Sequence, residues 1–136
     1  MGPESFSAGL TQWLVGTEQE ITLLEGDDAI TVRRYPQCFL LCAQLTHQPP
    51  PTQTVMETWL RLGGASLAHF QGALSVEPYT GQLWLLQCVW QEANQAAFFN
   101  QLESLLNQRD TWRSTAKRLA RTPEKLGPTP LRAQFY

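Results

Sequence analysis

The order of helical and extended segments is the feature that most constrains the fold of this chain. Apolar residues recur at helical spacing near the start, in the middle and over the last third, and at strand spacing between these parts. The pattern predicts one helix, three strands, a second helix, two more strands and a long last helix. The expected segments are a helix over residues 6–16, strands over 20–25, 29–34 and 38–45, a helix over 54–64, strands over 73–77 and 82–90, and a helix over 94–122.

Turn and cap residues mark the boundaries of these segments. A Gly-Asp-Asp turn over residues 26–28 and a Pro-Tyr-Thr-Gly turn over 78–81 each connect two strands. Thr52 or Thr54 can cap the second helix, and Gly63-Gly64 is expected to end it. Asn94 is a good cap for the last helix. Three consecutive prolines over residues 49–51 can form neither helix nor strand, so we expect a stiff spacer there.

The five predicted strands carry apolar side chains on both faces of the sheet, and the third and fifth have the pattern typical of strands that are covered on both sides. Three helices of a 136-residue chain cannot cover both faces of such a sheet, so another copy or a partner is expected to cover the rest. The predicted fold class is α+β: a twisted, mainly antiparallel sheet packed by helices in a homodimer. On the fifth strand, one face carries Leu83, Leu85 and Val89, and the other carries Trp84, Leu86, Cys88 and Trp90.

The length indicates a single domain, over residues 1–122, followed by a basic, proline-containing tail over 123–136. Charge is unevenly spread between these parts. Residues 1–108 hold three arginines and ten acidic residues, whereas residues 109–136 hold seven basic and two acidic residues. Such asymmetry fits nucleic acid, a partner of opposite charge, or a second subunit.

A basic stripe on the last helix needs separate consideration. Arg109, Arg113, Lys117 and Arg121 are spaced by four residues and therefore lie along one side of the helix. Phosphates would suit such a stripe. A solvated helix face, or cations that pair with the acidic body, would give the same pattern. Because the acidic body would repel a nucleic-acid backbone, nucleic acid is kept only as an alternative partner.

The cysteines and the N-terminus bear on the cellular compartment. Cys38 and Cys42 lie four residues apart on one predicted strand, about 13 Å, which is too far for a disulfide. Because these two and Cys88 all lie in apolar runs, we expect buried free thiols in a reducing cytosol. The N-terminus shows neither a signal-peptide pattern nor a myristoylation motif, and no apolar run is long enough to span a membrane. A cytoplasmic location is expected.

No motif for catalysis, cofactor binding or metal binding occurs in the sequence. The two histidines, His47 and His69, lie at the ends of predicted elements, away from Cys or Asp at ligand spacing. A phosphate-binding loop, a dinucleotide fingerprint and a nucleophile elbow are absent. We therefore predict a protein that is not an enzyme and has no catalytic, cofactor-binding or metal-binding residues. A small enzyme whose residues converge only in space is the weakest alternative.

The stretch from Trp59 to Arg113 resembles the class I chaperones of bacterial type III secretion, the family of the Tir chaperone. The element order agrees over roughly residues 4–120. The resemblance implies a small, acidic, dimeric protein with that order of elements. It rests on Trp59-Leu60-Arg61-Leu62 in the second helix, Gly72-Ala73-Leu74-Ser75-Val76-Glu77, Thr80-Gly81-Gln82-Leu83-Trp84-Leu85, and Phe99, Leu102, Leu105, Leu106 and Trp112-Arg113 in the last helix.

The resemblance also implies a mechanism and two contact surfaces. A homodimer of the chaperone would hold the N-terminal segment of a secreted effector in extended form, without turnover. The dimer contact is assigned to the second helix and the fourth strand, at Val55, Trp59, Leu62, Leu74 and Val76. The effector contact is assigned to the first helix and first strands, at Leu10, Trp13, Ile21, Leu23, Ile30 and Val32. Each of these residues has an alternative role in an ordinary core, since inward faces have the same composition.

Two further functions stay open beside the chaperone. A regulatory protein–protein interaction module could have the same fold and bind another regulator in place of a secreted cargo. A nucleic-acid binder would use the basic last helix, and its binding would weaken strongly with salt.

Overall fold

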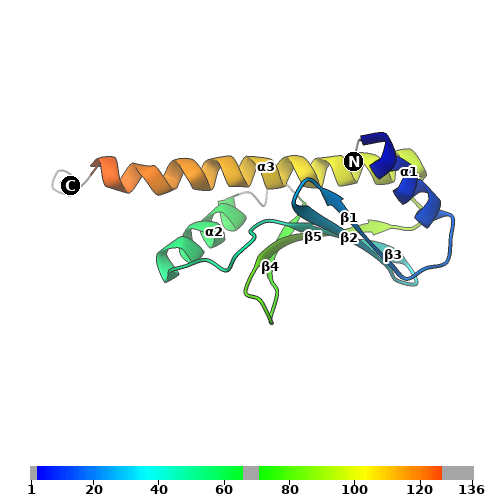
Figure 1. Ribbon diagram of the computed structural model, residues 1–136, viewed down its shortest axis with the longest axis horizontal. Helices are drawn as coiled ribbons and strands as arrows, with labels where there is room; N and C mark the ends of the chain where they lie inside the picture. The colour runs from blue at the N-terminus through cyan, green and yellow to red at the C-terminus, as the bar shows by residue number, and fades with distance from the viewer. Residues whose placement is uncertain (1–2, 66–70, 127–136) are drawn as a thin grey trace.

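The computed structural model describes residues 3–65 and 71–126, and its elements follow the predicted order (Figure 1). Five strands form one antiparallel sheet in the order β1-β2-β3-β5-β4. The predicted α+β class is confirmed. The elements are α1 (Pro3–Leu14), β1 (Glu20–Glu25), β2 (Asp28–Arg34), β3 (Cys38–Gln44), α2 (Gln53–Ala65), β4 (Ala73–Val76), β5 (Leu83–Trp90) and α3 (Gln95–Leu126).

The glycine pair does not end the second helix as predicted, because α2 continues through it to Ala65. A glycine that ends a helix adopts a left-handed conformation with positive φ. Among the described glycines, only Gly26 and Gly81 have positive φ. Gly63 instead packs inside the helix, where an added Cβ would lie 3.5 Å from the ring of Trp112. Gly63 is therefore an interior helix position in ordinary contact with α3, and it does not act as a helix end.

The last helix also runs further than predicted. It was expected to end at Thr122, before Pro123, but α3 continues to Leu126. Proline inside a helix removes one backbone hydrogen bond and crowds the carbonyl four residues earlier. Residues 117–120 are exposed, so water can satisfy the carbonyl that the proline frees. Of the predicted tail over 123–136, residues 127–136 lie outside the described residues.

Helices α1 and α3 cover one face of the sheet, and α2 lies at its β4 end. In Figure 1, α3 runs along the sheet, α1 lies over its β1 side, and α2 packs between α3 and β4. Aromatic rings pack α1 and α3 against β3. The ring centre of Phe39 lies 5.8 Å from that of Trp13 and 5.5 Å from that of Phe98. The buried core is formed by Leu10, Trp13, Ile30, Val32, Phe39, Leu41, Ala43, Leu45, Trp59, Leu83, Leu85, Val89, Phe98, Leu102, Leu105 and Trp112.

Side-chain caps begin the second and third helices. The hydroxyl of Thr52 accepts a hydrogen bond from the amide of Val55 at 3.2 Å, so Thr52 is the cap of α2. The side-chain oxygen of Asn94 accepts one from the amide of Ala97 at 2.7 Å, as predicted for α3. Both caps satisfy donors that have no partner within the helix.

The triple-proline segment crosses the β4–β5 turn. Gly81 has a φ of 76°, and a Cβ on it would lie 2.9 Å from the Cβ of Pro49. Both facts require glycine there. The side chain of Gln82 donates a hydrogen bond to the carbonyl of His47 at 2.7 Å. The segment is therefore held against the sheet on its way to α2.

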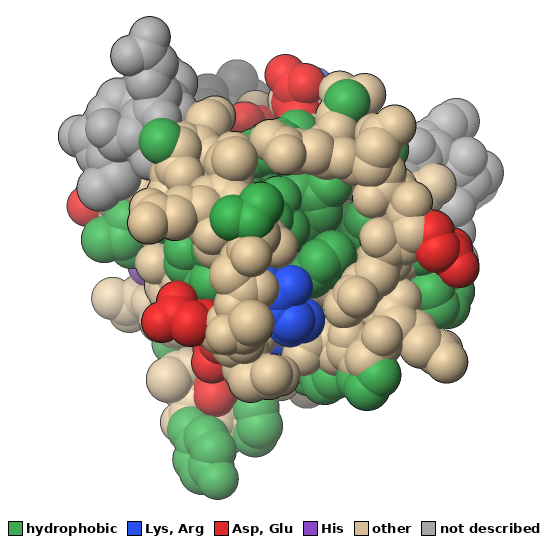
Figure 2. Space-filling model, turned by 90° about the vertical axis from the view of Figure 1, so that its right-hand side faces the viewer, with side chains coloured by type: hydrophobic (Ala, Val, Ile, Leu, Met, Phe, Trp, Pro, Cys, Tyr) green, Lys and Arg blue, Asp and Glu red, His purple; other side chains and the backbone are tan. Residues whose placement is uncertain are grey.

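Arg34 fixes the end of α1 to the sheet. Its guanidinium donates hydrogen bonds to the carbonyls of Trp13 at 2.8 Å and Glu18 at 3.1 Å. It also lies 4.3 Å from the centre of the Trp13 ring, within cation–π range. Figure 2 shows the end of the molecule that carries α1, where basic side-chain atoms lie among hydrophobic ones in a hollow.

Candidate protein-binding surfaces

The face of the sheet turned away from the helices, which we call the open face, has none of the described helices over it (Figure 1). The register of the central strands brings apolar side chains together there, because residues that alternate with the core residues point to the opposite face. On β3 and β5 these side chains are Cys38, Leu40, Cys42, Trp84, Leu86, Cys88 and Trp90.

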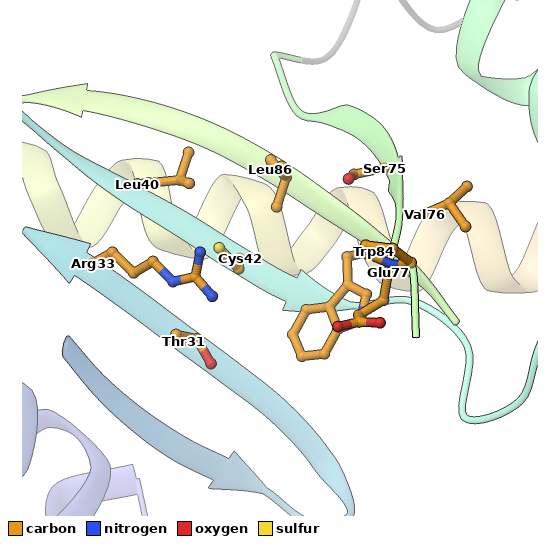
Figure 3. Close-up of a pocket in the computed structure, with 10 residues that line it drawn as sticks. Thr31, Arg33, Leu40, Cys42, Ser75, Val76, Glu77, Trp84 and Leu86 are labelled. Atoms are coloured by element: carbon orange, nitrogen blue, oxygen red, sulfur yellow. The ribbon is translucent and has the colours of Figure 1, made fainter. Parts of the chain in front are cut away.

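A pocket of about 420 Å³ lies on the open face (Figure 3). Leu40 and Leu86 form its apolar floor, and the indole of Trp84 forms a wall. Arg33 lies at one end and Glu77 lies beside Trp84 at the other. Apolar contact area with charges of opposite sign at its two ends is suited to a peptide segment.

Large apolar side chains extend the open face beyond this pocket. Trp90, at the end of β5, is 61% exposed, and Leu24, on β1, is 55% exposed. Exposed aromatic and aliphatic groups on one face are typical of protein interfaces. These positions are the part of the candidate binding surface that the sequence assignment did not include. The signal was present in the strands with two apolar faces.

A second surface lies between α2 and α3. A groove of about 450 Å³ is lined mostly by apolar groups, among them Val55, Trp59 and Leu119. Leu60 on α2 is 56% exposed, and Val76 on β4 is 47% exposed. This end of the molecule therefore presents apolar area as well.

A third hollow, of about 470 Å³, lies between α1, the β1–β2 turn and α3. Its apolar lining includes Phe6, Leu24, Phe99 and Leu106. Leu24 borders both this hollow and the open face, because it lies on the outermost strand.

The two ends of the sheet are edge strands. β1 pairs only with β2, and β4 pairs only with β5, among the strands that the structure describes. Each edge leaves backbone donors and acceptors to which an extended chain can pair. β1 lies under α1, and β4 lies beside α2, so the two edges belong to different surfaces.

The five residues assigned to a dimer contact gather at the α2–β4 end. Val55, Leu62 and Leu74 are half-buried, and Val76 is exposed. Trp59 is only 8% exposed, since it packs into the core of its own chain. A charge at Trp59 would therefore unfold the chain before it reported on a dimer, so an exposed neighbour is the better probe.

The six residues assigned to effector binding divide into two groups. Leu10 and Trp13 on α1, and Ile30 and Val32 on β2, are buried between the helices and the sheet and belong to the core. Ile21 and Leu23 on β1 keep part of their surface exposed. The assignment to effector binding stays a prediction, and the accessible positions at this end are those on the β1 edge.

Two arginines of the basic stripe form ion pairs with acidic residues of the same chain. Arg109 is buried and contacts Glu25 at 2.7 Å and Asp110 at 3.0 Å. Arg113 pairs with Asp28 through both its terminal nitrogens. The hydrogen bond from Arg113 is the main reason that the pKa of Asp28 is lowered. Two of the four stripe residues therefore pair with the acidic body, which was one alternative for the stripe.

The cysteines are less buried than predicted. Only Cys42 is buried, whereas Cys38 is half-buried and Cys88 is exposed. The prediction failed because all three lie in apolar runs, yet the face that they occupy has no helix over it. Burial raises the pKa of the Cys42 thiol to about 11.

Within residues 3–65 and 71–126, no three His, Cys, Asp or Glu side chains are placed to hold a metal ion. None of the described helices combines the length and apolar character needed to cross a membrane. His47 instead contacts Asp28 at 2.8 Å.

Comparison with solved structures finds other proteins with this fold. No family model and no curated protein sequence matches the chain. Among solved structures, a chain of the HopA1–SchA chaperone–effector complex is 17% identical, covers 81% of this chain and 88% of its own, and gives a TM-score of 0.60. A chain of the heterodimeric ExoU–SpcU complex from the type III secretion system of Pseudomonas aeruginosa is 17% identical, with 79% and 93% covered and a TM-score of 0.55. The predicted resemblance to the class I chaperones of type III secretion is confirmed at the level of the fold.

Proposed function

We propose that this chain is a cytoplasmic chaperone of bacterial type III secretion that binds the N-terminal segment of one or more effectors and keeps it extended. The observation that most supports this is the apolar open face, which continues to a free sheet edge at β1. The fold adds support, because one structure that shares it is a chaperone–effector complex.

An extended segment would add to the β1 edge. Backbone groups of Glu20–Glu25 on the outer side of β1 would pair with it, as in other strand additions. Side chains of the segment would then alternate between the two faces of the sheet. On one face they would meet Ile21 and Leu23, and on the other they would meet Leu24.

A homodimer would form at the other end of the molecule. Leu60 and Val76 are exposed there, beside the groove between α2 and α3. Because α2 and β4 lie away from the β1 edge, the dimer contact and the effector contact do not compete. Each copy in the dimer would keep its own β1 edge available.

The binding mode has a thermodynamic consequence. Ordering an extended segment costs conformational entropy, so the affinity per unit of buried area is low and a large area is needed. A surface that runs from the β1 edge across the open face supplies such area. Holding the segment extended keeps it from folding.

Hydrogen–deuterium exchange tests the proposed effector surface. The chain would be measured alone and with the N-terminal segment of a secreted protein encoded beside its gene. We expect the segment to slow exchange of the outward amides of β1 and to leave α2 and β4 unchanged. Slower exchange confined to the exposed residues 117–120 of α3 would place binding elsewhere.

A further inference from the structure

Two thiols meet on the open face of the sheet. The Sγ atoms of Cys38 on β3 and Cys88 on β5 lie 3.9 Å apart. Cys88 is exposed and Cys38 is half-buried, so solvent reaches the pair. We propose that this pair is a redox-modification site, at which a small-molecule disulfide such as oxidised glutathione converts the two thiols into a disulfide between neighbouring strands.

The register and the twist of the sheet select the partner of Cys88. Cys88 lies opposite Leu40, so Cys38 and Cys42 are both two residues from the opposite position and on the same face. In a flat sheet the two would be equivalent, but strand twist makes diagonal neighbours unequal. The sulfur of Cys38 is the one that contacts Cys88, and Cys42 is buried.

The reaction proceeds by two exchange steps. The exposed thiolate of Cys88 attacks one sulfur of oxidised glutathione, and one glutathione thiolate leaves. Cys38 then loses its proton and attacks the Sγ of Cys88, which expels the second glutathione. The protein gives up two electrons and two protons, and one oxidised glutathione becomes two molecules of glutathione.

The surroundings favour closure over a lasting adduct. The two strands are paired along their whole length, from Cys38↔Trp90 to Gln44↔Trp84, so the second thiol is held beside the first. Closing the bond must shorten the Sγ–Sγ separation from 3.9 Å to about 2.05 Å. Because diagonal neighbours lie about 7–8 Å apart, this needs side-chain rotation and a small local shift of the two strands. Exposed disulfides exchange readily with thiols, so an excess of reduced glutathione is expected to reverse the modification.

Intact-mass measurement with peptide mapping tests the site. The reduced chain, freed of reductant, would be incubated with oxidised glutathione and quenched in acid. We expect a product lighter than the reduced chain by two hydrogens, with a Cys38–Cys88 cross-link and one of the three thiols still open to alkylation. Later addition of reduced glutathione is expected to restore all three.

Serine variants provide matched controls, and circular dichroism would show that each stays folded. The Cys42→Ser variant is expected to form the cross-link like the parent. Cys38→Ser and Cys88→Ser are expected to give at most a glutathione adduct. Unreacted thiols, stable adducts without a cross-link, a bond to Cys42, or a bond between two copies of the chain would each overturn the proposal. The experiment uses no effector, so its failure would leave the proposed chaperone function untouched.

Discussion

Arg113 on α3 holds both carboxylate oxygens of Asp28 at the start of β2. Its Nη1 lies 2.8 Å from Oδ2, and its Nη2 lies 3.0 Å from Oδ1. The same guanidinium donates to the carbonyls of Leu45 at 2.9 Å and Gln44 at 2.9 Å. One side chain therefore joins α3 to the start of β2 and the end of β3. This residue of the basic stripe stabilises the fold.

Arg113→Ala is expected to lower the free energy of unfolding by about 2 kcal/mol, because it removes two hydrogen bonds to the partly buried Asp28 carboxylate and leaves two carbonyls without this donor. Urea unfolding followed by tryptophan fluorescence measures this. Arg33→Ala is the matched control. It removes an ion pair with Glu20 in which both side chains are about half exposed, and such pairs contribute under about 1 kcal/mol. Equal losses in both variants would contradict the role given to Arg113.

The same pair predicts an acid dependence of stability. The Arg113 hydrogen bond lowers the pKa of Asp28 from its ordinary value of 3.8. A group whose pKa is lower in the folded state stabilises the fold above its unfolded pKa, and that stability is lost as the pH falls through the folded pKa. The urea midpoint is therefore expected to drop as the pH is lowered below 3.8. Asp28→Asn should show a smaller drop, and an identical drop would contradict this account.

A side chain at position 72 is expected to clash with α3 and to lower the stability of the chain. An added Cβ there would lie 2.6 Å from the side-chain oxygen of Gln108 and 2.6 Å from a methyl of Leu105. The amide and carbonyl of Gly72 also bond the side chain of buried Gln108, each at 3.0 Å. Gly72→Ala should therefore destabilise the chain by about 1–3 kcal/mol in urea unfolding.

Gly63→Ala is the control for this substitution. Its Cβ would lie at an ordinary 3.5 Å from Trp112, inside α2. A glycine-to-alanine change in a helix interior is expected to be neutral or to stabilise by up to about 1 kcal/mol. A larger loss at Gly63 than at Gly72 would mean that the packing around α2 and α3 differs from the one described.

Trp90→Glu tests the open face as the effector surface. Because this side chain is 61% exposed, the change should leave the unfolding midpoint nearly unchanged. It should raise the Kd for the effector segment about tenfold or more, since it replaces a large apolar contact by a charge. Calorimetric titration measures the Kd. Tyr79→Glu changes an aromatic residue that is 94% exposed at the β4–β5 turn and does not line the pocket on the open face, and the variant is expected to bind as the parent does.

Most of the fold could be predicted from the sequence because each segment had one dominant period and a recognisable boundary. The first strand agrees at both ends, and Asn94 caps α3 as expected. The helix ends at Gly63-Gly64 and at Thr122 were wrong because glycine and proline mark only local preference. Gly63 keeps a helical backbone in ordinary contact with Trp112, and the exposed residues 117–120 leave the carbonyl freed by Pro123 open to water, so both helices continue.

The binding surface was less predictable, for a physical reason. Strand alternation tells which residues share a face, but two apolar faces have the same composition. The sequence therefore could not separate Val32, which lies in the core, from Trp90, which is exposed. The burial of Arg109 could not be predicted from the sequence either, because its ion-pair partner Glu25 is far away along the chain.

The mass of the chain in solution, with and without an effector segment, tests the central claim most directly. Size exclusion with light scattering would be run on the chain alone and after co-expression with the N-terminal segment of a secreted protein encoded beside it. The account predicts two copies of the 15.4-kDa chain, and after co-expression the same two copies with the segment retained. A single copy that retains no such segment would contradict it.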